Sequence, residues 1–287
     1  MRLMRRSARR LLALCAIAAA APPALRAQGV LVAPHGVFLD AAGRTGSFEL
    51  YNPGAEPVEV SVSTLFGYPV TDSLGNLTLR TAEAPDSGEP SAAGWIEAYP
   101  RRLTLRPLER QRVRLLARPP AGLPDGEYWT RLVVAAKGGH VPVTGVADTS
   151  AIRLGLTLEM RTIIAAFYRK GAPQTGITLS DVRADVAADS LVVRARLTRQ
   201  GNAAFLGTVR GRLVDSGGRQ VAGFAVPLGV YYALEPRFTT SVGLLAPARY
   251  TLHLEVASDR DDLPRETLVR ASTVRDSVGV TVAPRSP

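Results

Sequence analysis

The sequence predicts an all-β protein with two sandwich domains, and three observations lead to this fold class. Almost every segment after residue 27 either alternates apolar and polar residues or is a short apolar run. Clusters of Pro, Gly, Asp and Asn separate these runs at the spacing of β-sandwiches. No segment keeps a helical period over three turns.

Residues 1–27 are expected to be a signal peptide outside the fold. Five arginines form a basic start, and the apolar run Leu11–Ala21 is too short to span a bilayer. Ala27 supplies the small residue expected at the cleavage site, so the mature chain is predicted to begin at Gln28 and to be periplasmic. A retained N-terminal anchor is the alternative. Cys15 follows Leu14 in the middle of the run, which argues against a lipid-attachment site.

The predicted mature chain has 260 residues and no cysteine, so hydrophobic cores rather than disulfides must stabilise it. That length suits two domains of roughly 100 to 130 residues. We place them at 28–170 and 171–287. Six of the 35 basic residues and none of the 25 acidic ones lie in the leader, which leaves a net charge of +4. No basic block is interleaved with aromatic residues, and no later segment is apolar enough for a transmembrane span, so neither nucleic acid nor a bilayer-spanning segment is expected.

The first domain begins with short strand signals separated by turns. The expected strands are Val30–Val32, Val37–Leu39, Ser47–Tyr51 and Val58–Val62. The third ends at Asn52, Pro53 and Gly54, which is strong turn chemistry. The stretch Thr81–Ala93 is rich in Pro, Ser, Glu and Gly and is expected to be a mobile loop.

The segment Tyr99–Leu132 alternates strand and turn signals. Leu103 and Leu105 alternate with polar neighbours, and Val113 and Leu115 do the same after the turn at Pro107. A second turn at Leu123–Gly126 precedes a strand that begins at Tyr128–Leu132.

The longest strand signal runs over Ala151–Arg169. Its even-numbered apolar residues share one face, and these are Ile152, Leu154, Leu156, Leu158 and Met160. The strand precedes a predicted interdomain hinge at Gly171–Pro173. An ordinary core strand is the alternative interpretation of this pattern.

The second domain is expected to hold seven or eight strands between about Ile177 and Val282. Its clearest signals are five strands and one hairpin turn: Leu191–Leu197, Thr208–Val214, Asp215–Gly218 as the turn, Val226–Tyr232, Thr239–Leu244 and Arg249–Val256. A final strand signal covers Ala271–Val282, after a charged loop at Asp259–Glu266.

No catalytic or metal-binding constellation is evident. His35, His140 and His253 are scattered without paired ligand spacing, and the mature chain lacks cysteine, so no metal and no cofactor are expected. No serine has nucleophile-elbow spacing. The prediction is a protein that is not an enzyme, with an unrecognised catalytic site as the alternative.

The motifs QRVRL and LPDGEYW within Tyr99–Leu132, together with the proline near the start of the segment, resemble the first domain of the PapD-like periplasmic pilus-assembly chaperones. The resemblance implies two immunoglobulin-like sandwiches. It also implies that the last strand of the first domain binds a pilus subunit by strand addition. Leu154, Leu156, Leu158 and Met160 would then be the partner-binding residues. The second domain shares only the architecture.

The family holds the subunit's terminal carboxylate with an Arg on the first strand and a Lys near the end of the last one. The alignment places Gly36 and Ala165 at these positions, and neither side chain binds an anion. His35 and Arg161 are the nearby candidates for a carboxylate anchor, although Arg161 lies on the face opposite to the donor side chains.

The function predicted is therefore that of a periplasmic chaperone for an exported, pilus-type or other β-rich subunit. A homodimer through the same exposed strand is a further expectation. The alternative is a non-catalytic structural or surface-attached protein that kept the fold and lost the chaperone role. In that case its own loop, such as Thr81–Ala93, would cap the strand.

Overall fold

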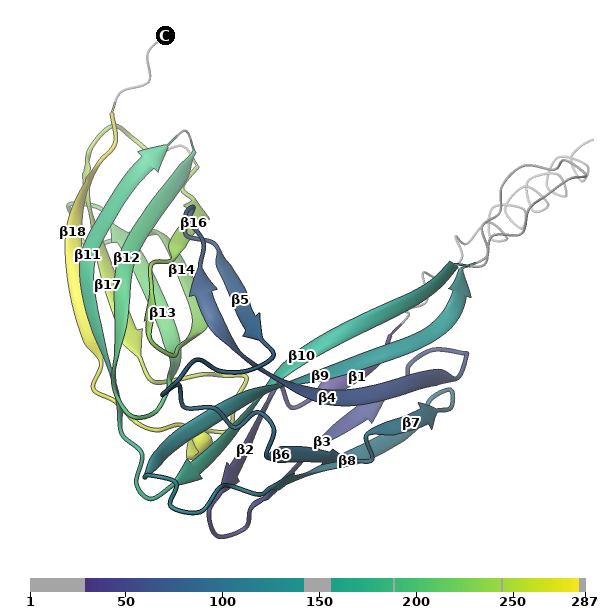
Figure 1. Ribbon diagram of the computed structural model, residues 1–287. Coiled ribbons are helices and arrows are strands. Elements are labelled where there is room, and N and C mark those ends of the chain that lie inside the picture. Colours follow the sequence, from purple (N-terminus) through teal and green to yellow (C-terminus); the bar gives the residue numbers. More distant parts are fainter. Residues whose placement is uncertain (1–28, 142–155, 188, 244, 284–287) are drawn as a thin grey trace, which may run out of the picture.

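The computed structural model describes residues 29–141, 156–187, 189–243 and 245–283, and it confirms the all-β fold class (Figure 1). Two β-sandwiches, each made of two sheets, meet at an angle. The predicted signal peptide lies outside the described residues. Within the described ranges no helix has the length and apolar character to cross a membrane.

The first sandwich packs a small sheet against a larger one. The small sheet has the order β1 (Leu31–Ala33), β3 (Thr45–Tyr51), β8 (Arg110–Ala117) and β6 (Ile96–Tyr99). The larger has the order β2 (Gly36–Asp40), β10 (Leu156–Lys170), β9 (Gly126–Val141), β4 (Val58–Thr71) and β5 (Leu77–Ala82), with β7 (Arg102–Leu105) beside β4. The chain therefore changes sheets between β1 and β2.

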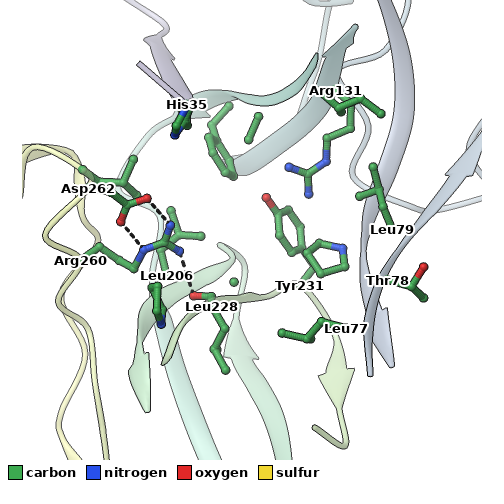
Figure 2. Close-up of a pocket in the computed structure, with 18 residues that line it drawn as sticks. His35, Leu77, Thr78, Leu79, Arg131, Leu206, Leu228, Tyr231, Arg260 and Asp262 are labelled. Atoms are coloured by element: carbon green, nitrogen blue, oxygen red, sulfur yellow. Dashed lines mark hydrogen bonds and ion pairs between the residues drawn. The ribbon is translucent and has the colours of Figure 1, made fainter. Parts of the chain in front are cut away.

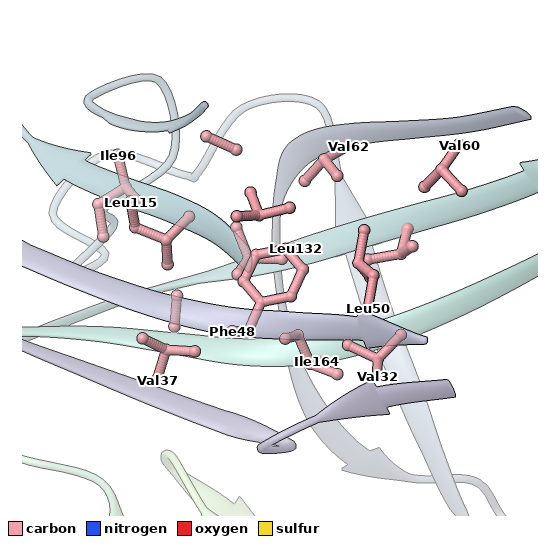
Figure 3. Close-up of a cluster of buried hydrophobic side chains, with 14 of the residues drawn as sticks. Val32, Val37, Phe48, Leu50, Val60, Val62, Ile96, Leu115, Leu132 and Ile164 are labelled. Atoms are coloured by element: carbon pink, nitrogen blue, oxygen red, sulfur yellow. The ribbon is translucent and has the colours of Figure 1, made fainter. Parts of the chain in front are cut away.

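The core of this sandwich consists of the inward residues of the alternating strands (Figure 3). Phe48 and Leu50 of β3 face Val60 and Val62 of β4, and all four are buried. The intervening residues Glu59 and Ser61 are exposed. The period-two pattern thus predicts the buried face, because successive side chains of a strand point to opposite sides.

The second sandwich likewise has two four-stranded sheets. One contains β11 (Thr175–Ala187), β12 (Ser190–Gly201), β15 (Ala233–Leu234) and β16 (Arg237–Ser241). The other has the order β14 (Gln220–Val230), β13 (Phe205–Val214), β17 (Arg249–Ala257) and β18 (Val274–Thr281). The predicted hairpin turn is present, since the Gly218 amide donates to the Asp215 carbonyl at 3.0 Å. A short 3₁₀ helix, η1 (Arg265–Thr267), precedes β18.

The expectation of a mobile loop over Thr81–Ala93 is wrong at both ends. Thr81 and Ala82 complete β5, which pairs with β4 and forms a hairpin that reaches the second sandwich (Figure 1). At the other end Ala92 is fully buried, and its amide donates to the Trp129 carbonyl at 2.9 Å. Composition did not reveal these contacts because they join residues far apart in the chain.

The two sandwiches are joined by an aromatic cluster and by hydrogen bonds from a buried ion pair of the first sandwich. Phe66, Trp129 and Phe167 of the first pack with Leu206 and Tyr231 of the second.

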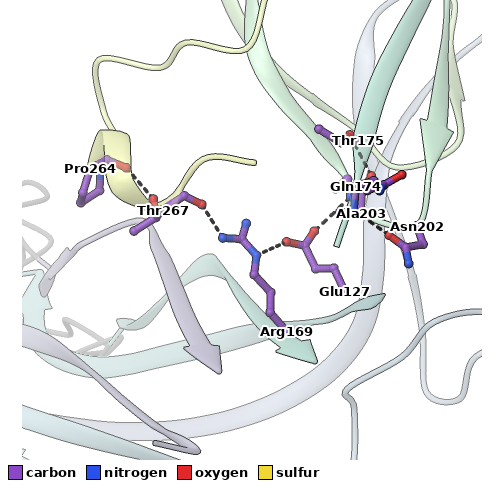
Figure 4. A network of polar contacts seen from close by, with 9 residues as sticks. Glu127, Arg169, Gln174, Thr175, Asn202, Ala203, Pro264 and Thr267 are labelled. Carbon is purple, nitrogen blue, oxygen red and sulfur yellow. Dashed lines mark hydrogen bonds and ion pairs between the residues drawn. The ribbon is translucent and has the colours of Figure 1, made fainter. Parts of the chain in front are cut away.

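Beside this cluster, Glu127 accepts a 2.7 Å bond from Arg169 (Figure 4). Burial raises the pKa of Glu127, and Arg169 opposes that rise. The ion pair therefore holds two charges in a site that excludes water.

Candidate partner-binding site

β10 is paired on both sides only near its C-terminal end. From Ala165 to Arg169 it lies between β9 and the parallel strand β2. From Leu156 to Ile164 its only partner among the described strands is β9. Figure 1 shows β9 and β10 extending together beyond the rest of the first sandwich. A strand edge of this kind presents unpaired backbone N–H and C=O groups that another strand can bind.

The apolar face of β10 passes from the core to solvent along the strand. Ile164 and Tyr168 are buried in the first sandwich. Leu158 and Met160 lie on the same face but are each 41% exposed. These two predicted contact residues therefore lie beyond the core of their own domain, next to the open edge.

The other two predicted contact residues are described less fully. The backbone of Leu156 pairs with Val141 of β9, and Leu154 lies outside the described residues. A β-bulge between Thr157 and Glu159 shifts the register of the pairing at Leu158.

Gly36 and Ala165, at the expected anchor positions, are direct neighbours across β2 and β10. These two residues begin a row of directly paired residues across the sheet. In this row Ala165 also pairs with Arg131 of β9, and Arg131 pairs with Leu65 of β4. Gly36, Ala165 and Arg131 all line a cavity of about 420 Å³ between the two sandwiches (Figure 2). The row therefore places an arginine where the two small residues leave space.

Three parts of the structure form this cavity. The first sandwich contributes the row and Ile163, the β4–β5 hairpin contributes Pro69 and Leu77–Leu79, and the second sandwich contributes Leu206, Tyr231 and the Arg260 loop. Most of the wall is apolar, so the charged groups that remain determine what binds there.

Arg131 is the cationic residue of this cavity that sequence reasoning missed. It is 7% exposed, its Nε donates to the Gly67 carbonyl at 3.0 Å, and its guanidinium lies 5.0 Å from the centre of the Tyr231 ring. Its Nη2 has no hydrogen-bond partner among the described residues. A signal was present in the sequence, because strand alternation puts Arg131 on the same face as Trp129.

The second arginine of the cavity is already neutralised. Arg260 donates to both carboxylate oxygens of Asp262, at 2.6 and 2.5 Å, and to the Leu228 carbonyl at 3.2 Å. The hydrogen bonds from Arg260 lower the pKa of Asp262 below the usual aspartate range. Burial raises the pKa of Tyr231, so its hydroxyl remains a neutral group beside Arg131.

Of the two anchor candidates from the sequence, only His35 lies at the cavity. His35 lines it, and its carbonyl accepts a 3.0 Å bond from the Ala165 amide. Arg161 instead forms an ion pair with Glu159 at 2.6 Å, and its side chain is 69% exposed. It does not line the cavity, so the structure separates it from the row.

No group of three or more potential metal ligands occurs in the part of the chain that the structure describes. The chemistry available at this site is therefore backbone pairing at an edge, apolar contact at Leu158 and Met160, and one buried cation.

No protein-family model and no curated protein match this sequence. Among the solved structures that match, the E. coli chaperone DraB is 14% identical, with 88% of this chain and 97% of that chain covered and a TM-score of 0.41. The YadV chaperone is 15% identical, with 86% and 98% covered and a TM-score of 0.45. A chain of the CsuC–CsuE chaperone–tip adhesion subunit complex from the Csu pili of Acinetobacter baumannii is 14% identical, with 88% and 98% covered and a TM-score of 0.42.

Each of these three structures is that of a chaperone or of a complex that contains one, and one of them comes from pili. All three TM-scores lie below 0.5.

Proposed function

We propose that this protein is a periplasmic chaperone that binds an exported, β-rich subunit of the pilus type by adding the open edge of β10 to the subunit's sheet. The observation that carries the proposal is the edge itself, because Leu156–Ile164 has a strand on one side only among the described residues. Backbone hydrogen bonds along such an edge give affinity, and alternating side chains give specificity.

Leu158 and Met160 would be the apolar contacts of the described part of the edge, with Leu154 and Leu156 as their predicted continuation. Full burial of a side chain of this size contributes about 1.5 to 3 kcal/mol. Since Leu158 and Met160 are each already more than half buried, the surface that remains is worth about 1 kcal/mol per residue. A tight complex therefore also needs the backbone bonds of the edge and further contacts.

The structural alternative requires the exposed face of β10 to be covered by the protein's own loop. The proposed cap, Thr81–Ala93, instead contacts Trp129, where Ser91 forms a bridge with that residue. Trp129 pairs with Phe167, near the opposite end of β10 from Leu158. This loop therefore does not cover Leu158 or Met160, and a close neighbour of Met160 is instead Gly29.

The test is to isolate the protein gently from its native periplasm and to identify what accompanies it by mass spectrometry. We expect a stoichiometric small exported β-protein with the wild type, and its loss from a Leu158→Glu/Met160→Glu variant. Leu108→Glu is the matched control, because Leu108 is 67% exposed and lies in a turn outside β10. A folded double variant that retained its subunit would contradict the proposal.

Self-association through the same edge is the competing use of this surface. Sedimentation at increasing concentration measures it, with and without the subunit. A dimer that the double variant cannot form, and that dissociates when the subunit is added, would indicate that self-association and subunit binding use the same edge. A dimer that excludes the subunit permanently would argue against a chaperone.

A further inference from the structure

Three arginines stand directly opposite one another on the outer face of the second sandwich. Arg183 of β11 pairs with Arg194 of β12, and Arg194 pairs on its other side with Arg237 of β16. All three are exposed, so this arginine triplet lies on the solvent side of its sheet. Like charges at directly opposite positions, where Cβ atoms are about 5 Å apart, destabilise a sheet. The triplet therefore costs the fold stability, which points to a role other than folding.

A β-bulge brings the first arginine into the triplet. Ser180 of β11 pairs with Arg196 of β12. The next pair is Arg183 with Arg194, so β11 holds one residue more than β12 between the two pairs. Asp181, within the bulge, has φ 53°, a left-handed conformation that is uncommon for residues other than glycine. Without the extra residue Arg183 would fall on the core-facing side of β11, so the strained backbone is what turns it outward.

The third arginine is held in place by the first sandwich. The Arg237 amide donates to the carbonyl of Gly75, in the β4–β5 turn, at 2.8 Å. Gly75 has φ 84°, and a Cβ atom there would lie 2.7 Å from Cβ of Arg237, so this close approach requires glycine. The neighbouring Glu235 amide donates to the Thr71 hydroxyl at 3.0 Å. The docked β4–β5 hairpin thus fixes one end of the triplet.

The acidic residues nearby do not neutralise the triplet. Asp181 and Glu235 both pair with Arg196, at 3.3 and 2.7 Å. Asp185 lies farther along β11, opposite an uncharged residue of β12. Within the described part of the chain, no arginine of the triplet forms an ion pair or a side-chain hydrogen bond. Their N–H donors are therefore available to a ligand.

A cavity of about 290 Å³ lies at the triplet. It is lined by two of the three arginines and by the bulge and its ion pairs: Arg183, Arg194, Asp181, Ala195, Arg196 and Glu235. With Arg237 beside it, four arginines and two carboxylates leave an excess of two positive charges. A guanidinium binds phosphate oxygens through two parallel hydrogen bonds, which a compact group above the sheet could receive from neighbouring strands.

We propose that the arginine triplet binds a phosphate group, either free in solution or carried by a lipid headgroup. A phosphate monoester has a charge of about −1.5 to −2 at pH 7, which matches the excess at the cavity, whereas one carboxylate compensates only half of it. Strands lie about 4.8 Å apart, so three long arginine side chains can reach the oxygens of one phosphate. The site is on the second sandwich and does not involve β10, so this inference is independent of the proposed function.

The first test is a titration of the full protein with sodium phosphate, followed by NMR of the arginine Nε–H groups. Sodium chloride at the same ionic strength is the reference, because screening alone weakens surface electrostatics. We expect saturable shifts of the triplet signals. Affinity should fall about 5- to 10-fold in Arg183→Gln and in Arg194→Gln, the effect of one exposed charged contact.

Arg212→Gln is the matched control for these variants. Arg212 is also an exposed strand arginine of the second sandwich, but its cross-strand neighbours are Gly223 and His253. It forms no ion pair within the described residues. The phosphate affinity of this variant should equal that of the wild type.

Thermal melting separates a binding role from a structural one. Without phosphate, Arg194→Gln should melt about 1 to 3 °C above the wild type, because the central like charge is removed. Phosphate should raise the melting temperature of the wild type and of Arg212→Gln but not that of Arg194→Gln. An arginine that served the fold alone would show the reverse, with a lower melting temperature after its replacement.

Vesicles distinguish the two sources of phosphate. Phosphatidylcholine vesicles that contain phosphatidic acid, whose headgroup is a phosphate monoester, are compared with pure phosphatidylcholine vesicles by co-sedimentation. Binding that requires phosphatidic acid and is lost in Arg194→Gln would assign the triplet to a lipid headgroup. Saturable binding of inorganic phosphate without vesicle binding would assign it to a free phosphate.

Three results would overturn the proposal. The first is the absence of both saturable phosphate shifts and vesicle binding in the wild type. The second is an unchanged phosphate affinity in folded Arg194→Gln, because the anion would then bind elsewhere. The third is binding of an oligoglutamate peptide to the triplet without binding of phosphate, which would assign the triplet to an acidic protein partner instead.

Discussion

Glu127 of β9 and Arg169 of β10 form a buried ion pair with an N···O distance of 2.7 Å at the junction of the two sandwiches. Each partner also bonds to the second sandwich. Glu127 accepts from the Ala204 amide at 3.0 Å, and Arg169 donates to the Thr267 carbonyl at 2.5 Å. Two neighbouring strands of the first sandwich thus hold two separate segments of the second. This pairing sets how the sandwiches meet beside the cavity.

Replacing Glu127 with Ala should lower the free energy of unfolding by about 3 kcal/mol, because it leaves Arg169 nearly buried without its partner. Urea denaturation measures the loss, and small-angle scattering should show a changed arrangement of the sandwiches. Glu49→Ala is the control, since Glu49 pairs with Arg110 at the same 2.7 Å distance but on the surface. That variant should lose less than about 1 kcal/mol. Equal losses would show that burial does not determine how much an ion pair contributes to the free energy of unfolding.

Asn52→Ala should destabilise the first sandwich by about 2 to 4 kcal/mol, because several backbone groups lose a partner at once. Asn52 is fully buried, and its amide donates to the carbonyls of Glu56, Leu105 and Arg106. The exposed Asn76→Ala variant, in the β4–β5 turn, should change stability by less than about 1 kcal/mol. Thermal unfolding of both variants tests this contrast. Similar losses would contradict it.

Two truncations on one face of β10 should differ sharply. Ile164→Ala removes a side chain that is 2% exposed and should cost about 2 to 4 kcal/mol. Leu158→Ala removes one that is 41% exposed and should cost less than about 1 kcal/mol. Chemical denaturation measures both. A large loss for Leu158→Ala would mean that this residue belongs to the protein's own core.

Amide hydrogen exchange rates in β10 should differ between the residues before Ala165 and those from Ala165 onward. Alternate amides within Glu159–Ile164 face the open edge and should exchange rapidly in the isolated protein. Amides in Ala165–Arg169 lie between β9 and β2 and should be protected. Addition of the subunit should then slow the edge amides selectively. Uniform protection of β10 in the free protein would rule out an open edge.

The carboxyl group of Asp262 should titrate below the ordinary aspartate range, because Arg260 stabilises its charged form. Its folded pKa is depressed, so the contribution of the pair to stability is present above the unfolded pKa and is lost as the pH falls through the folded value. Carboxyl carbon NMR follows this titration directly. In Arg260→Gln the midpoint should rise toward the ordinary value, and an unchanged midpoint would show that Arg260 is not the cause.

Much of the fold follows from local patterns in the sequence. The alternation of Val58–Val62 predicts a strand and its buried face, and the turn residues around Asn52 and Gly218 mark where strands end. These properties depend on neighbouring residues, since side-chain direction alternates along a strand whatever its partners are. The same reasoning predicts the shared face of Leu158 and Met160.

The candidate site depends on contacts that no local pattern contains. Arg161 and Arg131 are both arginines in strands, yet one lies at the surface beside Glu159 and the other in the cavity beside Tyr231. Which arginine reaches the cavity depends on the register of three strands from distant parts of the chain and on how the second sandwich docks. The sequence by itself therefore determined most of the strands, the faces of the alternating ones and the two small residues at Gly36 and Ala165. Only the tertiary structure decided where β10 loses its second neighbour and which charge faces the cavity, because both follow from pairing between segments that are remote in sequence.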